Sequence, residues 1–276
     1  GSASTAPIYL WSNADASGTG AIVINNYTDI TSQGGPIYLG GSAAATDTTP
    51  TTYAINNSST QCSGVTLGGS AVATDQVKIA SNGGDITIRG KSTYDAADCM
   101  GIIAWGGPNL NSGNGALVLD GYQSGGTGTN NTHGVELGRG ATSAMTTTYT
   151  SAKTSGTAIS ITGAVAGGTS NNARGIVAWV AGPVNITATG GGNIVMTGTT
   201  AASNSTQGIS LNYSSVLTSG GNITIDAGTK AFDIGGYAVA QTNAIGGTSS
   251  SAKAGTVTLR ADTYAWGSYA TTLQNA

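Results

Sequence analysis

The stretch Ser219-Gly220-Gly221-Asn222-Ile223-Thr224-Ile225-Asp226-Ala227-Gly228 contains the pattern that organises the whole chain. Two glycines precede an alternation of apolar and polar residues, and a small residue and a glycine follow it. This order predicts a short β-strand with a turn at each end. Because successive side chains of a strand point to opposite faces, we expect Ile223 and Ile225 to face inward and Thr224 to face outward.

This pattern, which we name the A motif, recurs along the chain. Its copies lie at residues 7–10, 34–40, 83–90, 114–121, 156–163, 191–198, 219–228 and 254–259. A second pattern, the B motif, is a glycine followed by two apolar residues with one variable residue between them. Its copies lie at residues 20–24, 64–67, 101–104, 134–137, 175–178, 208–211 and, less cleanly, 236–239. A weaker third apolar segment precedes several A motifs, at residues 29–30, 77–79, 184–186 and 216–217.

Three short strands in every repeat predict an all-β protein with a parallel β-solenoid of about seven to eight coils. The A motifs are spaced 29 to 49 residues apart. A solenoid permits such variation, because its strands stack at about 4.8 Å while the loops between them lengthen freely. The coil that starts at Ile37 inserts a polar loop through Thr46, Thr49, Pro50 and Thr51. We expect residues 1–6 to be a lead-in left by cloning, and residues 7–276 to form one domain cut from a longer protein.

Composition excludes several classes of partner. The chain has 45 glycines, 8% charged residues, a net charge of -3 and a pI near 4.8. No basic surface is available to hold phosphates, so nucleic acids and anionic membranes are poor partners. No apolar run approaches the 18 or more residues of a membrane-spanning helix, so membrane insertion is not expected. No pattern predicts a cofactor.

Two A motifs resemble those of a known family. Gly220 to Gly228, Gly-Gly-Asn-Ile-Thr-Ile-Asp-Ala-Gly, and Gly83 to Gly90, Gly-Gly-Asp-Ile-Thr-Ile-Arg-Gly, resemble the repeats of filamentous-haemagglutinin-like proteins, which are large secreted bacterial adhesins. The resemblance extends over residues 7–262. It implies a right-handed parallel β-helix, export to the surface of a Gram-negative bacterium and a role in attachment. The coils here are longer and less regular than those of the family's regular shaft, and long solenoid loops are common binding surfaces.

Residues suited to catalysis are scarce. The chain has one His, one Glu and eleven Asp, whereas β-helix lyases and hydrolases need clustered carboxylates or basic groups on one face. Asp95 and Asp98 form the closest acidic pair, in a loop near Lys91; they are either solvated loop residues or residues with a catalytic or calcium-binding role. His133 has no second ligand nearby in sequence, so neither a metal site nor an enzyme is expected.

The two cysteines occupy matching places. Cys62 and Cys99 each lie two residues before the glycine of a B motif in consecutive coils. Stacked positions lie about 4.8 Å apart, within the Cα range of a disulfide, so we predict a bond between them. The alternative is a pair of reduced thiols, because side chains on parallel neighbours point the same way.

Two tryptophans form the sharpest binding hypothesis. Trp105 and Trp179 follow near-identical B motifs two coils apart, and Gly138 holds the equivalent place in the coil between them. Outward indoles about 9.6 Å apart over a glycine would form a stacking platform for sugar rings. Alternatively, each indole folds over the turn beside it. Trp11 and Trp266 lie near the two ends, where we expect them to cover open coil edges.

These observations predict a secreted or cell-surface adhesion segment. We expect it to be monomeric as a fragment and to bind a glycan or another ligand on a host or neighbouring cell through Trp105, Trp179, Asp95 and Asp98. One alternative is a structural shaft without a ligand. The other is a pectin-lyase-like carbohydrate-active enzyme, which shares the fold and requires converging carboxylates. Fold alone does not decide among these.

Overall fold

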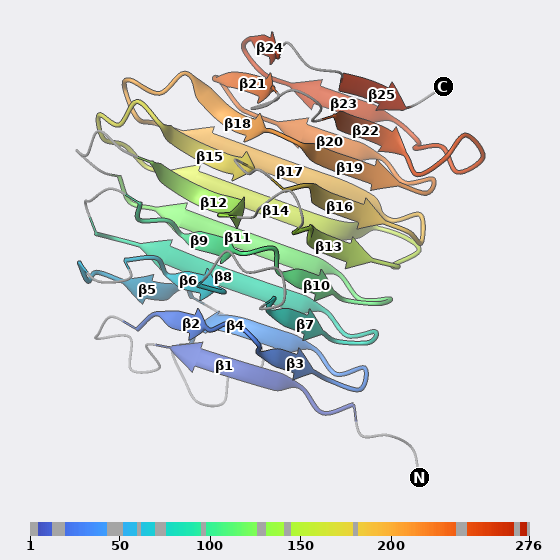
Figure 1. Ribbon diagram of the computed structural model, residues 1–276, viewed down its shortest axis with the longest axis horizontal. Helices are drawn as coiled ribbons and strands as arrows, with labels where there is room; N and C mark the ends of the chain where they lie inside the picture. Colours follow the sequence, from blue (N-terminus) through green and yellow to red (C-terminus); the bar gives the residue numbers. More distant parts are fainter. Residues whose placement is uncertain are drawn as a thin grey trace.

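The computed structural model describes residues 5–12, 20–42, 52–59, 62–69, 76–94, 98–125, 131–140, 145–178, 182–235, 242–267 and 271–274. The chain folds into a right-handed parallel β-helix with three strands in each of eight coils (Figure 1). The coils stack in sequence order, from β1 beside the N-terminus to β24 and β25 beside the C-terminus. The part of the chain described contains no helix with the length and apolarity needed to cross a membrane.

Each side of the β-helix is one parallel sheet, with one strand from every coil. Sheet A contains β1 (Ile8–Ser12), β4 (Ile37–Gly41), β8 (Ile86–Ser92), β11 (Leu117–Gln123), β14 (Thr157–Val165), β17 (Asn193–Thr200), β20 (Ile223–Asp226) and β23 (Val257–Arg260). Sheet B contains β2 (Ile22–Ile24), β6 (Val65–Leu67), β9 (Ile102–Trp105), β12 (Thr132–Arg139), β15 (Ala173–Ala178), β18 (Gln207–Leu211), β21 (Ala231–Ile234) and β24 (Tyr264–Trp266). Sheet C contains β3 (Asp29–Thr31), β7 (Lys78–Ala80), β10 (Asn109–Asn111), β13 (Thr147–Ser151), β16 (Val184–Ala188), β19 (Ser214–Thr218), β22 (Asn243–Gly247) and β25 (Thr271–Gln274).

The interior is a set of apolar ladders that run through the coils. Ile223 and Ile225 are fully buried while Thr224 between them is partly exposed, which confirms the alternation expected for the A motif. Ile223 pairs with Ile194 of the coil before and with Val257 of the coil after. Each ladder continues only through its neighbours, so apolar burial is shared between coils and none of them has a core of its own.

The glycines that end the A motif and begin the B motif lie where sheets A and B touch. A Cβ atom on Gly121 of β11 would lie 2.1 Å from the carbonyl oxygen of Gly134 in β12. A Cβ atom on Gly134 would in turn lie 2.3 Å from the backbone nitrogen of Ala164 in β14. At this point the backbones of sheets A and B are in contact with each other. The two motifs therefore share glycine for one reason, which is that no side chain fits between the sheets at this point.

The insertion of the second coil interrupts a strand of sheet A. Strand β4 pairs with the first half of β8, and the additional strand β5 (Ala54–Asn56) pairs with the second half. Between them, Gly41 and Thr52 form an antiparallel bridge that closes the base of the insertion. Sheet A is thus complete in this coil although its strand comes from two segments. Thr46, Thr49, Pro50 and Thr51 lie outside the described residues.

One predicted B strand was wrong. The sequence pattern placed the B strand of the seventh coil at residues 236–239, which lie outside the described residues. The strand that this coil contributes to sheet B is β21, at residues 231–234. Phe232 of β21 pairs with Ile209 and is fully buried. Strand β20 ends at Asp226, whose carboxylate accepts a hydrogen bond from the Gly228 amide at 2.9 Å. This tight turn brings the chain to sheet B early, and Ala231 at the start of β21 pairs with Gln207 rather than with the B-motif glycine Gly208.

Candidate functional site

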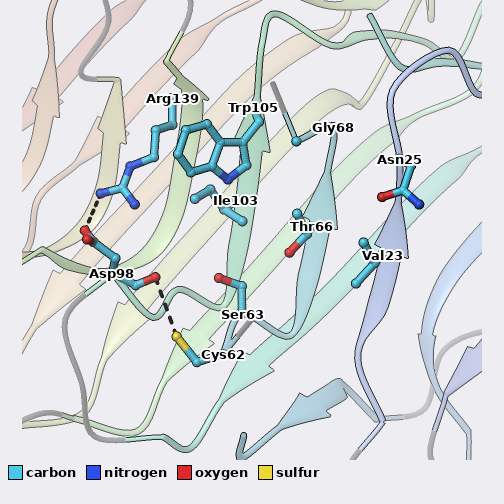
Figure 2. Close-up of a pocket in the computed structure, with 11 residues that line it drawn as sticks. Val23, Asn25, Cys62, Ser63, Thr66, Gly68, Asp98, Ile103, Trp105 and Arg139 are labelled. Atoms are coloured by element: carbon cyan, nitrogen blue, oxygen red, sulfur yellow. Dashed lines mark hydrogen bonds and ion pairs between the residues drawn. The ribbon is translucent and has the colours of Figure 1, made fainter. Parts of the chain in front are cut away.

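The outer face of sheet B has a hollow of about 410 Å³ over the first four coils (Figure 2). Its floor follows one register column, in which Val23 of β2 pairs with Thr66 of β6, and Thr66 pairs with Ile103 of β9. Trp105 and Arg139 line it as well. The other lining residues come from the connections beside these strands and are Asn25, Cys62, Ser63, Gly68, Gly69 and Asp98.

A disulfide lies at one end of the hollow. Cys62 and Cys99 are bonded, with their Cα atoms 5.0 Å apart, as expected for equivalent positions of adjacent coils. The bond joins the segments that lead into β6 and β9, and the Cys62 sulfur lies 3.7 Å from the carbonyl oxygen of Asp98 (Figure 2). It therefore ties the Asp98 segment to the preceding coil.

The residue beside Trp105 in the next coil is Arg139. The expectation that Gly138 holds this place was wrong, because the pairing of β9 with β12 shifts between Glu136 and Arg139. Gly138 takes a φ of +84°, a left-handed conformation that glycine adopts without strain, and it bulges out of the register. The platform of indoles over a glycine is thus replaced by an indole beside a guanidinium. Trp179 lies outside the described residues.

The Arg139 side chain packs on the Trp105 ring. Its guanidinium carbon lies 5.4 Å from the centroid of the ring, within the range of a cation–π contact. The indole is partly buried as a result, and it still lines the hollow together with Ile103. Figure 2 shows the Arg139 and Trp105 side chains next to each other, with Ile103 beside the indole. Trp105 is therefore held in place by protein contacts on one side and open to the hollow on another.

Two carboxylates hold Arg139. Its Nε lies 3.0 Å from Oε1 of Glu136, and its Nη2 forms an ion pair with Asp98. Asn131 also donates to Asp98 through its side-chain amide, at 3.3 Å. The Asp98 side chain remains 53% exposed, so it stands at the rim of the hollow as a fixed, accessible acceptor. Asp95 lies outside the described residues.

Glu136 was not identified from the sequence. Its side chain is 1% exposed although it lies on the outer face of sheet B, and one of its oxygens has no hydrogen-bond partner among the described residues. Burial raises its pKa to about 7; Arg139 opposes the shift, and the charge of Asp98 adds to it. The sequence signal was the position itself, because a glutamate stands at an outward place of a B strand where neighbouring coils have isoleucine and valine.

His133 lies three residues before Glu136 on the same strand and is also buried. It pairs in register with Arg174 of β15. Neither ring nitrogen has a partner of acceptable hydrogen-bond geometry in the described part of the chain, although the Thr132 backbone is close. Burial, and then the charges of Arg174 and Arg139, lower the pKa of His133 well below its usual value. The imidazole is therefore neutral.

A polar network continues from Arg174 toward the C-terminal coils. The Arg174 Nε donates to the Gln207 side chain, and Gln207 donates to Asp233 at 2.8 Å. The Ser210 hydroxyl donates to the same carboxylate oxygen at 3.1 Å. The outer face of sheet B thus has an open hollow over its first four strands and a row of interacting polar side chains beyond them.

The hollow exposes groups that are suited to contact with a ligand. Asp98 and Glu136 share Arg139, but only Asp98 is accessible, so the pair does not present two converging carboxylates to a substrate. In the ranges described, no three His, Cys, Asp or Glu side chains lie close enough together to hold a metal ion. What the hollow does present is an aromatic ring, an apolar floor and fixed polar groups at the rim.

Comparisons with known proteins found no family model, no curated protein and no solved structure that matches this chain. Function is therefore inferred from the geometry of the site.

Proposed function

We propose that this chain is an adhesion segment of a large secreted bacterial surface protein of the filamentous-haemagglutinin type, and that the hollow beside Trp105 binds a neutral sugar of a cell-surface glycan. The observation that carries the proposal is the meeting of Trp105, Arg139 and Asp98 at one open hollow on a rigid sheet. Two of these residues, Trp105 and Asp98, were singled out as ligand contacts from the sequence alone.

The composition of the hollow supports a sugar as the ligand. A sugar ring has a face of C–H groups, which packs on an aromatic ring, and an edge of hydroxyl groups, which needs fixed hydrogen-bond partners. Trp105 and Ile103 supply the apolar contact. Asp98, Asn25 and Thr66 supply polar groups around it. A volume of about 410 Å³ falls within the range typical of small-ligand sites.

The charges around the hollow favour a neutral sugar over an acidic one. Arg139 is the basic residue that lines the hollow, and two carboxylates already accept its hydrogen bonds. A carboxylated sugar would compete for Arg139 and would lie next to the negative charge of Asp98. Such like-charge contacts are unfavourable, so we expect sialylated and uronate-containing glycans to bind more weakly.

Two further features support export of the protein and a role as a rod that carries the binding site. Disulfides form and persist in oxidising environments, and the bond between Cys62 and Cys99 suits an exported protein. Parallel strands from eight coils form continuous ladders along the axis. A body of this kind holds a binding site at a fixed place along a rod.

The test is binding of the folded chain to an array of neutral and acidic glycans, together with the variants Trp105→Ala and Asp98→Asn. Trp266→Ala is the matched control, because Trp266 is 51% exposed in the last coil, away from the hollow. Circular dichroism checks that each protein is folded. We expect neutral glycans to bind, and Trp105→Ala to weaken binding roughly tenfold or more while the control leaves it unchanged.

Absence of binding by the folded wild-type chain would reject the sugar site and favour the ligand-free shaft. Binding that is equally strong in Trp105→Ala and Asp98→Asn would place the ligand elsewhere on the molecule.

A further inference from the structure

The outward positions of sheet A hold a second group of aromatic side chains, on a different side of the β-helix from the hollow. We name it the aromatic strip and define it by its rings, which are Tyr9, Trp11, Tyr38, Tyr53 and Tyr122. They belong to the first, second and fourth coils, at the end of sheet A formed by β1, β4, β8 and β11 (Figure 1). All five are partly exposed.

Three of the rings stack across the first two coils. Tyr9 and Tyr38 are partners in register, with ring centroids 5.5 Å apart and planes at 8°. Tyr9 and Trp11, two residues apart on β1, have centroids 5.2 Å apart and planes at 16°. Trp11 therefore lies on the face of sheet A with the tyrosines, and the expectation that it covers the open end of the β-helix was wrong.

The remaining two rings contact charged groups of neighbouring coils. The Tyr53 hydroxyl donates to the carboxylate of Asp120, 3.0 Å from each oxygen. Arg89 donates to the same carboxylate at 3.0 Å, and its guanidinium carbon lies 4.6 Å from the Tyr53 ring centroid. Lys91 lies 5.0 Å from the ring centroid of Tyr122. Rings and hydrogen-bonding groups are thus held in fixed positions on one face.

The fold itself does not require these rings. The positions equivalent to Tyr9 and Tyr38 in later coils are Ser160, Val195, Thr224 and Thr258, and those equivalent to Trp11 are Thr162, Thr197, Asp226 and Arg260. Those coils stack in the same register and bury the same inward ladder. The aromatic residues are therefore concentrated at one end of a sheet that small polar residues support equally well.

We propose that the aromatic strip is a second carbohydrate-binding surface, which holds a linear neutral polysaccharide along sheet A. The face presents rings in the first, second and fourth coils and, beside them, a guanidinium–carboxylate pair in which each charge is compensated. The exposed parts of these stacked rings contact the C–H groups of a sugar chain, and the polar groups exchange hydrogen bonds with its hydroxyls. A polymer suits an open row, whereas a single sugar suits a hollow.

Composition and extent disfavour a folded protein as the occupant. A stable protein interface takes roughly 20–30 residues on each side and has few charges at its centre. The rings of the strip come from only three coils, and Arg89 and Asp120 stand among them. A strip that binds a protein instead would not retard the chain in gels that contain polysaccharide.

The test is affinity electrophoresis of the folded chain in gels that contain a soluble neutral polysaccharide, either hydroxyethyl cellulose or galactomannan, or the anionic polygalacturonate. The variant is Trp11→Thr with Tyr38→Ser, which introduces the residue types that later coils have at these positions. The matched control is Val195→Ala with Thr224→Ala, at the same outward positions of later coils. If the double variant loses its circular dichroism spectrum, Trp11→Thr alone replaces it.

We expect at least one neutral polysaccharide to retard the wild-type chain, the strip variant to bind roughly tenfold more weakly, and the control to match the wild type. No retardation by either neutral polysaccharide, equal retardation of the variant, or retardation by polygalacturonate alone would overturn the proposal. Trp105→Ala is measured in parallel: retardation that the strip variant loses and Trp105→Ala keeps supports the strip, whereas retardation that only Trp105→Ala loses places the polysaccharide in the hollow and overturns the proposal.

Discussion

Arg139 stands beside Trp105 in the register of sheet B, with its guanidinium carbon 5.4 Å from the centroid of the indole ring. This relationship exists because Gly138 bulges out of strand β12. Without the bulge, Gly138 would be the neighbour of Trp105, and Arg139 would occupy the next place along the strand. One glycine conformation therefore decides which side chain borders the candidate sugar site.

The bulge leads to the first prediction. Gly138→Ala should destabilise the protein by about 1–3 kcal/mol, because a non-glycine residue in a left-handed conformation is strained. The added Cβ would also lie 2.5 Å from the Thr147 hydroxyl oxygen. Urea unfolding measures the change. Gly69→Ala is the matched control, since its Cβ meets no atom within 4 Å. Equal unfolding midpoints for the two variants would contradict the strain attributed to Gly138.

The disulfide leads to the second prediction. The bond spans 37 residues, and the chain-entropy model assigns a loop of that size about 3–4 kcal/mol of stabilisation. The double variant Cys62→Ser, Cys99→Ser should therefore unfold at a lower urea concentration than the wild type. A reducing agent should shift the wild type toward the variant and leave the variant unchanged. Insensitivity of the wild type to reduction under unfolding conditions would argue against a structural bond.

Glu136 leads to the third prediction. Its pKa is raised from 4.5 to about 7, so between these values the folded state holds a proton that the unfolded state has lost. The free energy of unfolding therefore decreases as pH rises from 4.5 to about 7. The total decrease that Glu136 causes is about 3 kcal/mol at most. Glu136→Gln should remove this fall. Urea unfolding of the wild type and the variant at pH 5 and pH 8 measures it, and an unchanged difference between the two pH values would refute it.

His133 leads to the fourth prediction, of opposite sign. Its folded pKa lies well below the usual 6.5, so the unfolded state binds a proton first as pH falls. The resulting loss of stability begins near pH 6.5 and approaches about 1.4 kcal/mol per pH unit until the folded pKa is reached. His133→Phe should abolish this loss and leave two fewer unpaired buried nitrogens.

Between pH 4.5 and 6.5 the two groups change the free energy of unfolding in opposite directions. Removing one group should therefore leave the pH dependence that the other group causes. Stability should decrease with rising pH in His133→Phe, and should decrease with falling pH in Glu136→Gln. Parallel pH profiles for the two variants would show that one of these buried groups does not titrate as its surroundings indicate.

Much of the fold was predictable because strand periodicity is local. The alternation in Ile223, Thr224 and Ile225 depends on residues next to one another, and their burial follows it. The disulfide between Cys62 and Cys99 was predictable for a similar reason, since both cysteines stand at the same distance from a B motif. The missed strand at residues 231–234 has the alternation but lacks the leading glycine by which the other B strands were found.

The site depended on relations that no local pattern contains. Asp98 and Trp105 were marked by their residue types, but the sequence did not indicate that Arg139 joins them, because that contact depends on a one-residue shift between coils. The buried states of Glu136 and His133 depend on what covers the outer face of sheet B, and the aromatic strip depends on rings from three coils meeting on one face. The sequence by itself determined the repeat, the inward ladders and the paired cysteines, because each is written in neighbouring residues. The tertiary structure alone decided register and burial, because these depend on how loops and bulges align one coil with the next.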